Sequence, residues 1–536
     1  MNVFLLLQDI KGVFIGLYKY IQQHFSLGCF IVAIINFIAT FYTDNLIFEY
    51  DDIDIFNIIK IKIIFLIILV FIWQFVGYLI KNYSMSDNIK NFIKFSGIYF
   101  FIMMLFQLAL WPFIVGNQMY YGYFNDTIHL SNNAVFQGIF IRHFRIYSLM
   151  LIPNIAGIPI IQVLTIALII GYIMQTIKNY FKLNKSVYFF YVPFLSPLII
   201  QFNLHIEKDI LYGYSLLFLI AILLFHKLEK SLDKLNMNLF FIAVLSAVVA
   251  SIRPGGIFFF VTTPAILYLL NYKFINLQKI ILFTVFSILI SMIFIPNIVS
   301  TVVLDKNGES YKNVYILNKT FKVLLKEAVE DDNEYILDEF ESGTNLNPEK
   351  ILSKNTILCD GFFTKLPERD KDKFEIISKK LIKEYYDEYV QYKFMRFCFQ
   401  QRLIDLNPNP HDISKYDYYS YKSYIAIKDK IVQISPTLYA KVIGYFKTYN
   451  SYLGHPYYTL IMLLIAIYGI CFFVSILFRI KKVFIIICFL IGYIIFQILI
   501  VPYPGFRFFF PCYITAYLVM FYLIFYFISN KKNNTD

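Results

Sequence analysis

The chain has 536 residues, of which 59% are hydrophobic and only 16% are charged, and its mean hydropathy is +0.61. Soluble proteins carry about 25% charged residues, so this composition excludes an ordinary soluble protein and indicates a polytopic membrane protein. The formal net charge of +12 does not call for nucleic acid as a partner, because membrane proteins gather Lys and Arg in their cytoplasmic loops.

Long apolar runs recur along the chain. About 20 apolar residues cross the hydrocarbon core of a bilayer as a helix. We therefore expect an all-α polytopic membrane protein with about twelve transmembrane helices, at 26–42, 61–80, 95–115, 157–177, 187–203, 210–226, 237–252, 256–271, 280–303, 456–478, 483–502 and 508–529. The run 187–203 contains Pro193 and Pro197. The preceding segment Met1–His24 has apolar residues at helical spacing and no basic start, which predicts a helix in the membrane interface rather than a signal peptide.

Lysine and arginine predict the orientation, since cytoplasmic loops carry an excess of both. The short loops on one side are rich in them: Lys81, Lys90, Lys94, Lys178, Lys182, Lys185, Lys227, Lys230, Lys234, Lys273, Lys279, Arg479, Lys481 and Lys482, with Lys531 and Lys532 in the tail. We expect that side to be cytoplasmic, and twelve spans then place both termini inside. The expected location is a bacterial inner or plasma membrane.

The predicted spans fall into two groups around one polar segment. Residues 1–303 hold about nine spans and 456–536 hold three. Residues 304–455 carry charge throughout and contain no spanning run. We expect a small, mostly helical extracytoplasmic domain there, with helical spacing of apolar residues clearest in Phe374–Arg402.

Two further features belong to this outer segment. Cys359 and Cys398 are its two cysteines, and an oxidising exterior would permit a disulfide between them. The acids of the run Glu327–Glu341 could bind a divalent metal, but the run lacks EF-hand spacing. A solvated helix face is therefore the interpretation we favour. No cofactor is required by the sequence.

The outer loop 116–156 contains the stretch Asn117–Ser148, which is polar but rich in Tyr, Phe and Ile. A loop of this kind is expected to lie at the membrane–water boundary, where a lipid-linked substrate presents its head group. Asp126 is the best candidate for a general base, because sugar transfer to a hydroxyl needs a group that takes the proton. The alternative is that Asp126 caps a short helix starting at Thr127, and the two roles are compatible.

Basic residues on the predicted outer side depart from the charge bias, so a specific role is expected for them. Several cations at one membrane depth could bind a phosphate, and Arg holds it with two parallel hydrogen bonds. The alternative is that each side chain extends from the end of a span to water, which we prefer for Lys60 and Lys62. Phosphate binding is the interpretation we favour for the cations beside Pro/Gly breaks or acids, which are Lys208, Arg253 and Arg507. Arg142 and Arg145 belong to the first large outer loop, and Arg142 is a further candidate for substrate binding.

The remaining candidates are two acids and two histidines. Glu207 and Asp209 flank Lys208, where they could orient the cation, supply a second acid, or form a plain ion pair at the end of a span. His143 and His455 lie near span entries, and a lone histidine is more often structural than catalytic.

With the outer loop around Asp126, the Lys208-Asp209 pair and the RPGG and PGFR stretches that hold Arg253 and Arg507, the chain resembles the GT-C superfamily of membrane glycosyltransferases. Its members include protein O-mannosyltransferase-like and aminoarabinose transferase-like enzymes, and the likeness covers about 95–303 and 456–529. The resemblance implies a polyprenyl-phosphate sugar donor, a lipid, glycan or protein acceptor, Asp126 as the loop acid, and Lys208, Arg253 and Arg507 around the lipid phosphate.

The main rival is a transporter or a flippase of lipid-linked glycans. Such proteins usually carry ionisable residues near mid-membrane and repeated halves. The predicted spans have no Asp, Glu, Lys, Arg or His in their middle, and the charges gather at the outer ends. This pattern favours chemistry at the outer boundary.

Overall fold

The computed structural model describes 26–44, 55–81, 87–109, 139–154, 156–204, 208–225, 232–271, 324–325, 327–344, 376–377, 379–390, 437–438, 440–442, 444, 456–500 and 506–533. These residues form helices and turns, and no strand occurs among them. Five of the helices are long and apolar enough to cross a membrane: Ile58–Tyr78, Asp87–Ala109, Gly157–Tyr180, Lys481–Leu499 and Phe509–Asn530. The expected class, an all-α multi-pass membrane protein, is confirmed, while the number of twelve spans stays a prediction.

The chain divides into two compact units. The first comprises Met1–Phe294, Asn409–Phe489 and Phe510–Asp536, and the second comprises Ile295–Pro408 and Leu490–Phe509. The helices in or largely within the first unit are α2 (Leu27–Ala39), η1 (Thr40–Thr43), α4 (Ile55–Lys81), α5 (Asp87–Ala109), α7 (Ile139–Leu151), α8 (Gly157–Tyr180), η2 (Lys185–Phe190), α9 (Tyr191–Phe194), α10 (Pro197–Leu204), α11 (Lys208–Phe225), α12 (Leu232–Ile252), η3 (Pro254–Gly256), α13 (Ile257–Asn271), α23 (Pro456–Leu477) and α25 (Phe506–Asn533).

Most of the expected runs coincide with one helix each, but 187–203 does not. That run is divided among η2, α9 and α10, so it does not form one continuous helix, and its crossing of the membrane stays a prediction. Proline lacks the N–H that continues a helix, and Pro197 instead stands first in α10, where no N–H is needed. The broken backbone is held from α5: the Tyr99 hydroxyl donates to the Phe194 carbonyl at 3.2 Å, and the Tyr191 hydroxyl donates to the Phe95 carbonyl at 2.6 Å.

The outer stretch 117–148 is not a loop throughout. From residue 139 it forms α7, whose Ile146, Leu149 and Met150 pack in one buried cluster with Phe65 of α4 and Ile158 of α8. The apolar residues of this stretch recur at helical spacing and bury one face. Residues 139–148 are therefore helical within the predicted connection, whose outer location stays a prediction, and 117–138 lies outside the described residues.

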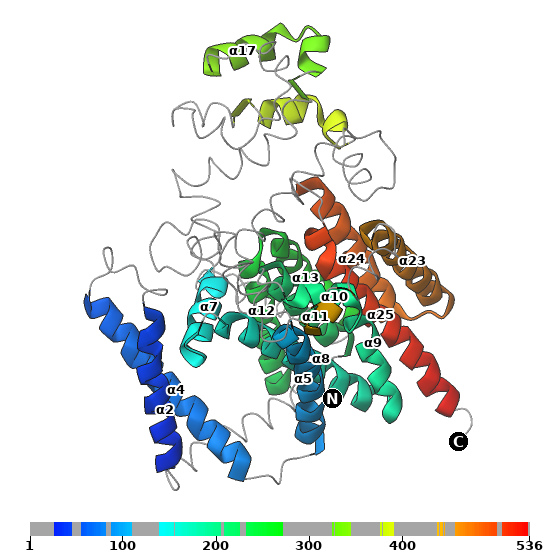
Figure 1. The fold of residues 1–536 in the computed structure, drawn as a ribbon. Coiled ribbons are helices and arrows are strands. Elements are labelled where there is room, and N and C mark those ends of the chain that lie inside the picture. Colours follow the sequence, from blue (N-terminus) through cyan, green and yellow to red (C-terminus); the bar gives the residue numbers. More distant parts are fainter. Residues whose placement is uncertain are drawn as a thin grey trace. The chain divides into compact units, whose positions relative to one another are not determined.

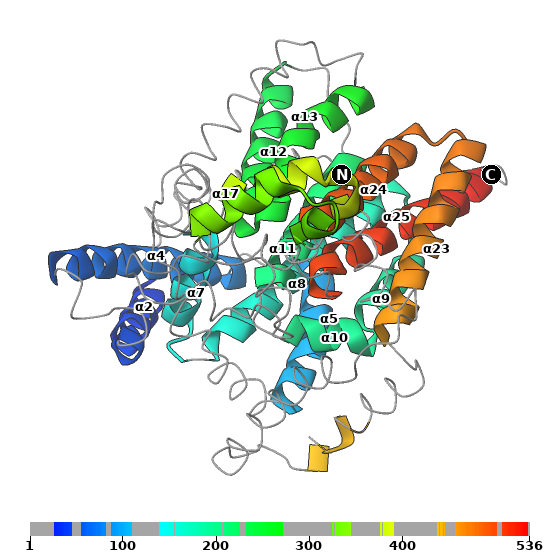
Figure 2. The same cartoon turned by 90° about the horizontal axis from the view of Figure 1, so that it is seen from above.

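The bundle of the first unit is built on close helix pairs. α5 packs along α8, and the two lie side by side in Figure 2. A methyl group on Gly171 of α8 would lie 2.0 Å from the Ser96 Oγ of α5, so glycine is what allows this approach. α2 crosses α4 (Figure 1), where a methyl group on Gly77 would lie 2.5 Å from the Cys29 Sγ.

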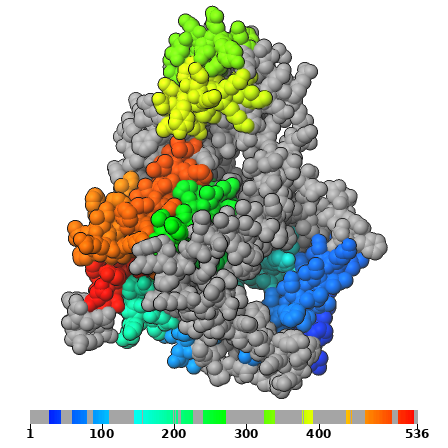
Figure 3. Space-filling view, turned by 180° about the vertical axis from the view of Figure 1, so that it is seen from behind, coloured from blue at the N-terminus to red at the C-terminus, as the bar shows by residue number. Residues whose placement is uncertain are grey.

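Other helices keep an apolar face at the surface. Figure 3 shows α23, in orange, at the surface of the chain, where Ile470, Phe473 and Leu477 are 63%, 72% and 76% exposed. The spacing of three and four residues puts these side chains on one side of the helix. A face of this kind is what a helix presents to lipid.

In the second unit the described helices include α17 (Glu334–Thr344) and the segment Lys379–Val390, which is helical apart from a turn at Tyr385. The Asn333 amide donates to the Tyr385 hydroxyl at 3.2 Å, and the Tyr389 hydroxyl donates to the Leu499 carbonyl at 3.0 Å. The described part of Phe374–Arg402 is thus helical as expected. Cys359 and Cys398 lie outside the described residues, so the disulfide stays a prediction.

Candidate functional site

A buried ion pair joins the start of α11 to the end of α12. Arg253 Nη1 lies 2.7 Å from Asp209 Oδ1, and the two side chains are only 7% and 6% exposed. Both residues were candidates from the sequence, and they lie far apart along the chain. The structure therefore brings Asp209 against Arg253, which is one of the arrangements expected for an acid at the end of a span.

Local sequence explains why the two charges meet at helix ends. Asp209 lies in the first turn of α11, where a negative charge complements the positive end of the helix dipole. Arg253 follows the last residue of α12, where a positive charge is favoured for the converse reason. Burial of both groups is tolerable because each supplies the other with an opposite charge.

The RPGG break fixes the backbone of Arg253. The Gly256 N–H donates to the Arg253 carbonyl at 2.9 Å, closing the turn of η3. A methyl group on Gly256 would lie 2.3 Å from the Val249 carbonyl oxygen, so a side chain at this position would force the turn apart. The glycine is thus needed for the close return of the chain that holds Arg253 in place.

A network of neutral polar side chains is centred on Asn203, near the end of α10. The Asn203 amide donates to the hydroxyls of Tyr99 and Tyr214 at 3.0 and 2.8 Å, and the Gln162 amide donates to the Asn203 carbonyl at 3.2 Å. These bonds tie α10 to α5, α8 and α11. The connection 205–207 and the start of α11 therefore follow a firmly anchored helix end.

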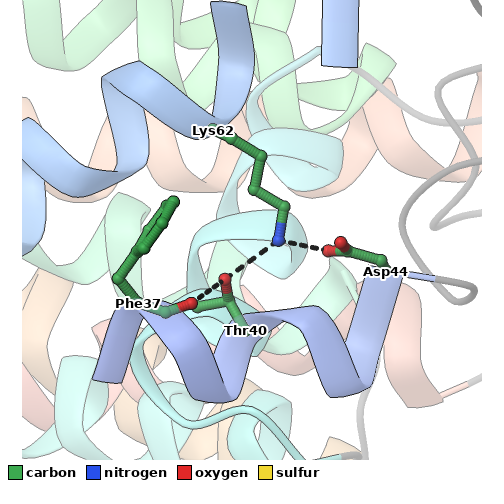
Figure 4. A network of polar contacts seen from close by, with 4 residues as sticks. All are labelled: Phe37, Thr40, Asp44 and Lys62. Carbon is green, nitrogen blue, oxygen red and sulfur yellow. Dashed lines mark hydrogen bonds and ion pairs between the residues drawn. The ribbon is translucent and has the colours of Figure 1, made fainter. Parts of the chain in front are cut away.

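A second buried ion pair lies between α2–η1 and α4, and it was missed by the sequence analysis (Figure 4). The Lys62 ammonium pairs with the Asp44 carboxylate, donates to Thr40 Oγ1 at 2.9 Å and lies 4.1 Å from the centre of the Phe41 ring. Burial raises the pKa of the Asp44 carboxyl, while the neighbouring Lys62 ammonium acts in the opposite direction.

The interpretation that Lys62 extends to water is therefore wrong. Its side chain is 7% exposed, because α2 packs on α4 and offers a carboxylate, a hydroxyl and an aromatic ring. Lys60, two residues earlier, is exposed, as expected for a lysine at the end of a span.

The α2–α4 pair also holds the end of α7. The Asn36 amide of α2 donates to the Met150 and Leu151 carbonyls at 3.2 and 3.4 Å, and its oxygen accepts from the Trp73 indole of α4 at 3.1 Å. The bonds to Met150 and Leu151 satisfy carbonyls that a helix end leaves open. α7 carries the backbone of Arg142 and His143 and the buried Arg145.

Several predicted site residues cannot be placed beside these. Asp126, Glu207 and His455 lie outside the described residues. Lys208 and Arg507 stand at the starts of α11 and α25, and Arg142 and His143 stand in α7, but their side chains lie outside the described part. The convergence of Asp126, Arg253 and Arg507 on one cavity stays a prediction.

Comparison with known proteins gives no relative: no family model, no curated protein and no solved structure matches this chain. Among the described residues, no group of three or more His, Cys, Asp and Glu side chains is arranged to hold a metal.

Proposed function

We propose that the protein is a membrane glycosyltransferase that moves a sugar from a polyprenyl-phosphate donor to an acceptor hydroxyl on the extracytoplasmic face. The observation that carries the proposal is the buried Asp209–Arg253 pair at 2.7 Å. It joins two helix ends beside a Pro/Gly break, and the predicted topology puts these ends at the outer surface of the membrane. Ionisable groups inside membrane proteins usually serve function, and arginine is suited to phosphate.

In the proposed reaction the acceptor oxygen attacks the anomeric carbon and the bond from that carbon to the phosphate oxygen breaks. The polyprenyl phosphate leaves with the bonding electron pair, and the configuration at the anomeric carbon inverts. Asp126 takes the proton from the attacking hydroxyl. Negative charge builds on the departing phosphate, and cations already in place stabilise that transition state more than the ground state. Arg253, Lys208 and Arg507 are the residues proposed for this role.

Purified protein supplied with polyprenyl-phosphate sugars tests the proposal, with released polyprenyl phosphate measured by mass spectrometry. Arg253→Ala should lower both release and donor affinity, and Arg253→Lys should restore them in part, because lysine lacks the two-pronged guanidinium. Lys62→Met is the matched control, since it disrupts a buried ion pair elsewhere in the bundle. Wild-type turnover and donor affinity in both Arg253→Ala and Arg507→Ala would refute the lipid-phosphate donor.

A transporter or flippase of lipid-linked glycans is the second candidate. It gains support from the Asp44–Lys62 pair, since Lys62 lies within the apolar helix Ile58–Tyr78 and buried ionisable pairs mark many transport pathways. Proteoliposomes separate the two functions: a flippase moves the intact lipid-linked sugar between leaflets, whereas a transferase consumes it only when an acceptor is present.

A further inference from the structure

Arg253 is a buried cation that is paired with an anion in the structure. Its side chain carries a guanidinium cation and is 7% exposed. A buried cation without a counter-charge is strongly unfavourable. In the structure the counter-charge is the Asp209 carboxylate, at 2.7 Å.

Carboxylate and phosphate are equivalent partners for a guanidinium. Both present two oxygens to the planar set of N–H donors, and arginine binds either with short, charge-assisted hydrogen bonds. A phosphate that approached Arg253 from the side of Nη1 would therefore require the donors that face Asp209. The two anions cannot share that position without strong repulsion.

The position of the pair allows an exchange of this kind. Asp209 is the second residue of α11, directly after the connection 205–207, and Arg253 stands between α12 and η3. Both charges are at helix ends rather than within a helix. The positive end of α11 remains in place if the carboxylate turns away, and a helix N-terminus favours an incoming anion.

We infer that the Asp209 carboxylate occupies the place on Arg253 that a lipid-linked phosphate takes, so that substrate must displace Asp209 to bind. This inference rests on the proposed function and adds a regulator of donor affinity to it. Only the molecules in which the ion pair is open can bind phosphate. The apparent affinity for phosphate is therefore reduced in proportion to the fraction of open molecules. Removing the carboxylate removes this reduction.

The inference predicts opposite effects for the two members of one ion pair. Asp209→Asn removes the Asp209 carboxylate from Arg253 Nη1, and binding of farnesyl phosphate, a short polyprenyl phosphate, should become about tenfold tighter than in the wild type. Arg253→Gln and the double variant should bind at least about tenfold more weakly, because the cation is gone. A pair with a purely structural role would weaken binding in all three variants.

The measurement is isothermal titration of the full-length chain in detergent with farnesyl phosphate, and separately with inorganic phosphate. Asp44→Asn is the matched control, since it leaves the buried Lys62 without its carboxylate but should keep wild-type affinity for the probe. If Asp209→Asn does not survive purification, the yield of folded protein with and without farnesyl phosphate replaces the titration. Recovery by the probe in Asp209→Asn alone supports the inference.

Three results would overturn it: no gain in Asp209→Asn, an equal gain in Asp44→Asn, or a wild-type chain that binds inorganic phosphate as tightly as farnesyl phosphate, which would assign the site to the free ion. Where the yield is measured instead, a yield of folded Asp209→Asn protein that farnesyl phosphate does not raise would also overturn the inference. Because the titration involves no sugar transfer, opposite effects without transferase activity would reject the proposed reaction and keep the anion exchange. Transferase activity without opposite effects would reject the exchange alone.

Discussion

The Asp44–Lys62 pair gives a quantitative test of how α2 is held on α4. Lys62→Met keeps the aliphatic stem and removes the ammonium, which leaves the Asp44 carboxylate buried at 7% exposure. Loss of one partner of a buried pair costs about 3–5 kcal/mol. Asp44→Asn should cost less, because Lys62 keeps its bond to Thr40 and its contact with the Phe41 ring. Asp44→Asn with Lys62→Met leaves no unpaired charge and should cost less than Lys62→Met alone.

Cys29 reports the separation of the two helices, since its thiol lies against Gly77 of α4. In a chain that keeps Cys29 as its only cysteine, the thiol is half-buried in the closed pair and labels at a basal rate, and the rate of maleimide labelling above that basal rate follows the population in which α2 has opened. Lys62→Met should raise that rate roughly 100-fold or more, the equivalent of at least about 3 kcal/mol. A chain that keeps only the buried Cys471 of α23 controls for global unfolding. A wild-type rate in Lys62→Met, or a double variant as fast as Lys62→Met, would refute the reasoning.

Three further predictions follow from the site and the packing. Asp126→Asn should lower sugar transfer about 10²–10⁴-fold while folding and donor binding persist, since Asn keeps the shape and cannot take a proton; near-wild-type turnover would move the base elsewhere. Gly171→Ala should destabilise the α5–α8 pair by about 1–3 kcal/mol in detergent unfolding, because a methyl group there meets Ser96, whereas Gly97→Ala, with open space around it, should cost far less. A cysteine introduced at an exposed site in 305–454 should react with an impermeant reagent on intact cells, and labelling only after lysis would reverse the predicted topology.

Helix positions were largely predictable because they depend on the length of apolar runs. The runs at 157–177 and 456–478, for example, coincide with α8 and α23 within a few residues. The run 187–203 is also largely apolar, but hydropathy ignores the missing N–H of Pro193 and Pro197. Whether prolines bend a helix or end it depends on partners elsewhere. Here the Tyr99 hydroxyl satisfies the Phe194 carbonyl of the broken run, and the Tyr191 hydroxyl ties that run to α5.

The polar contacts were less predictable because they depend on which helix faces meet. Asp209 had three compatible roles in the sequence, and only the packing of α11 on α12 brings it to Arg253. Lys62 resembled a lysine at a span end, and its partner Asp44 became evident once α2 lay across α4. Asn36 and Asn203 gave a weaker signal, an amide within an apolar run, which often marks a contact between membrane helices.

The two buried ion pairs differ in a way that bears on function. Lys62 lies among a carboxylate, a hydroxyl and a ring, all from one continuous segment of α2–η1, so this cation is enclosed by the helix pair that it joins. Arg253 lies between α12 and η3, where the helix is interrupted, and it pairs with an acid from the first turn of α11. Hence equal burial does not imply equal roles: the Asp44–Lys62 pair fixes α2 on α4, and the Asp209–Arg253 pair is the one from which a lipid phosphate can displace the carboxylate.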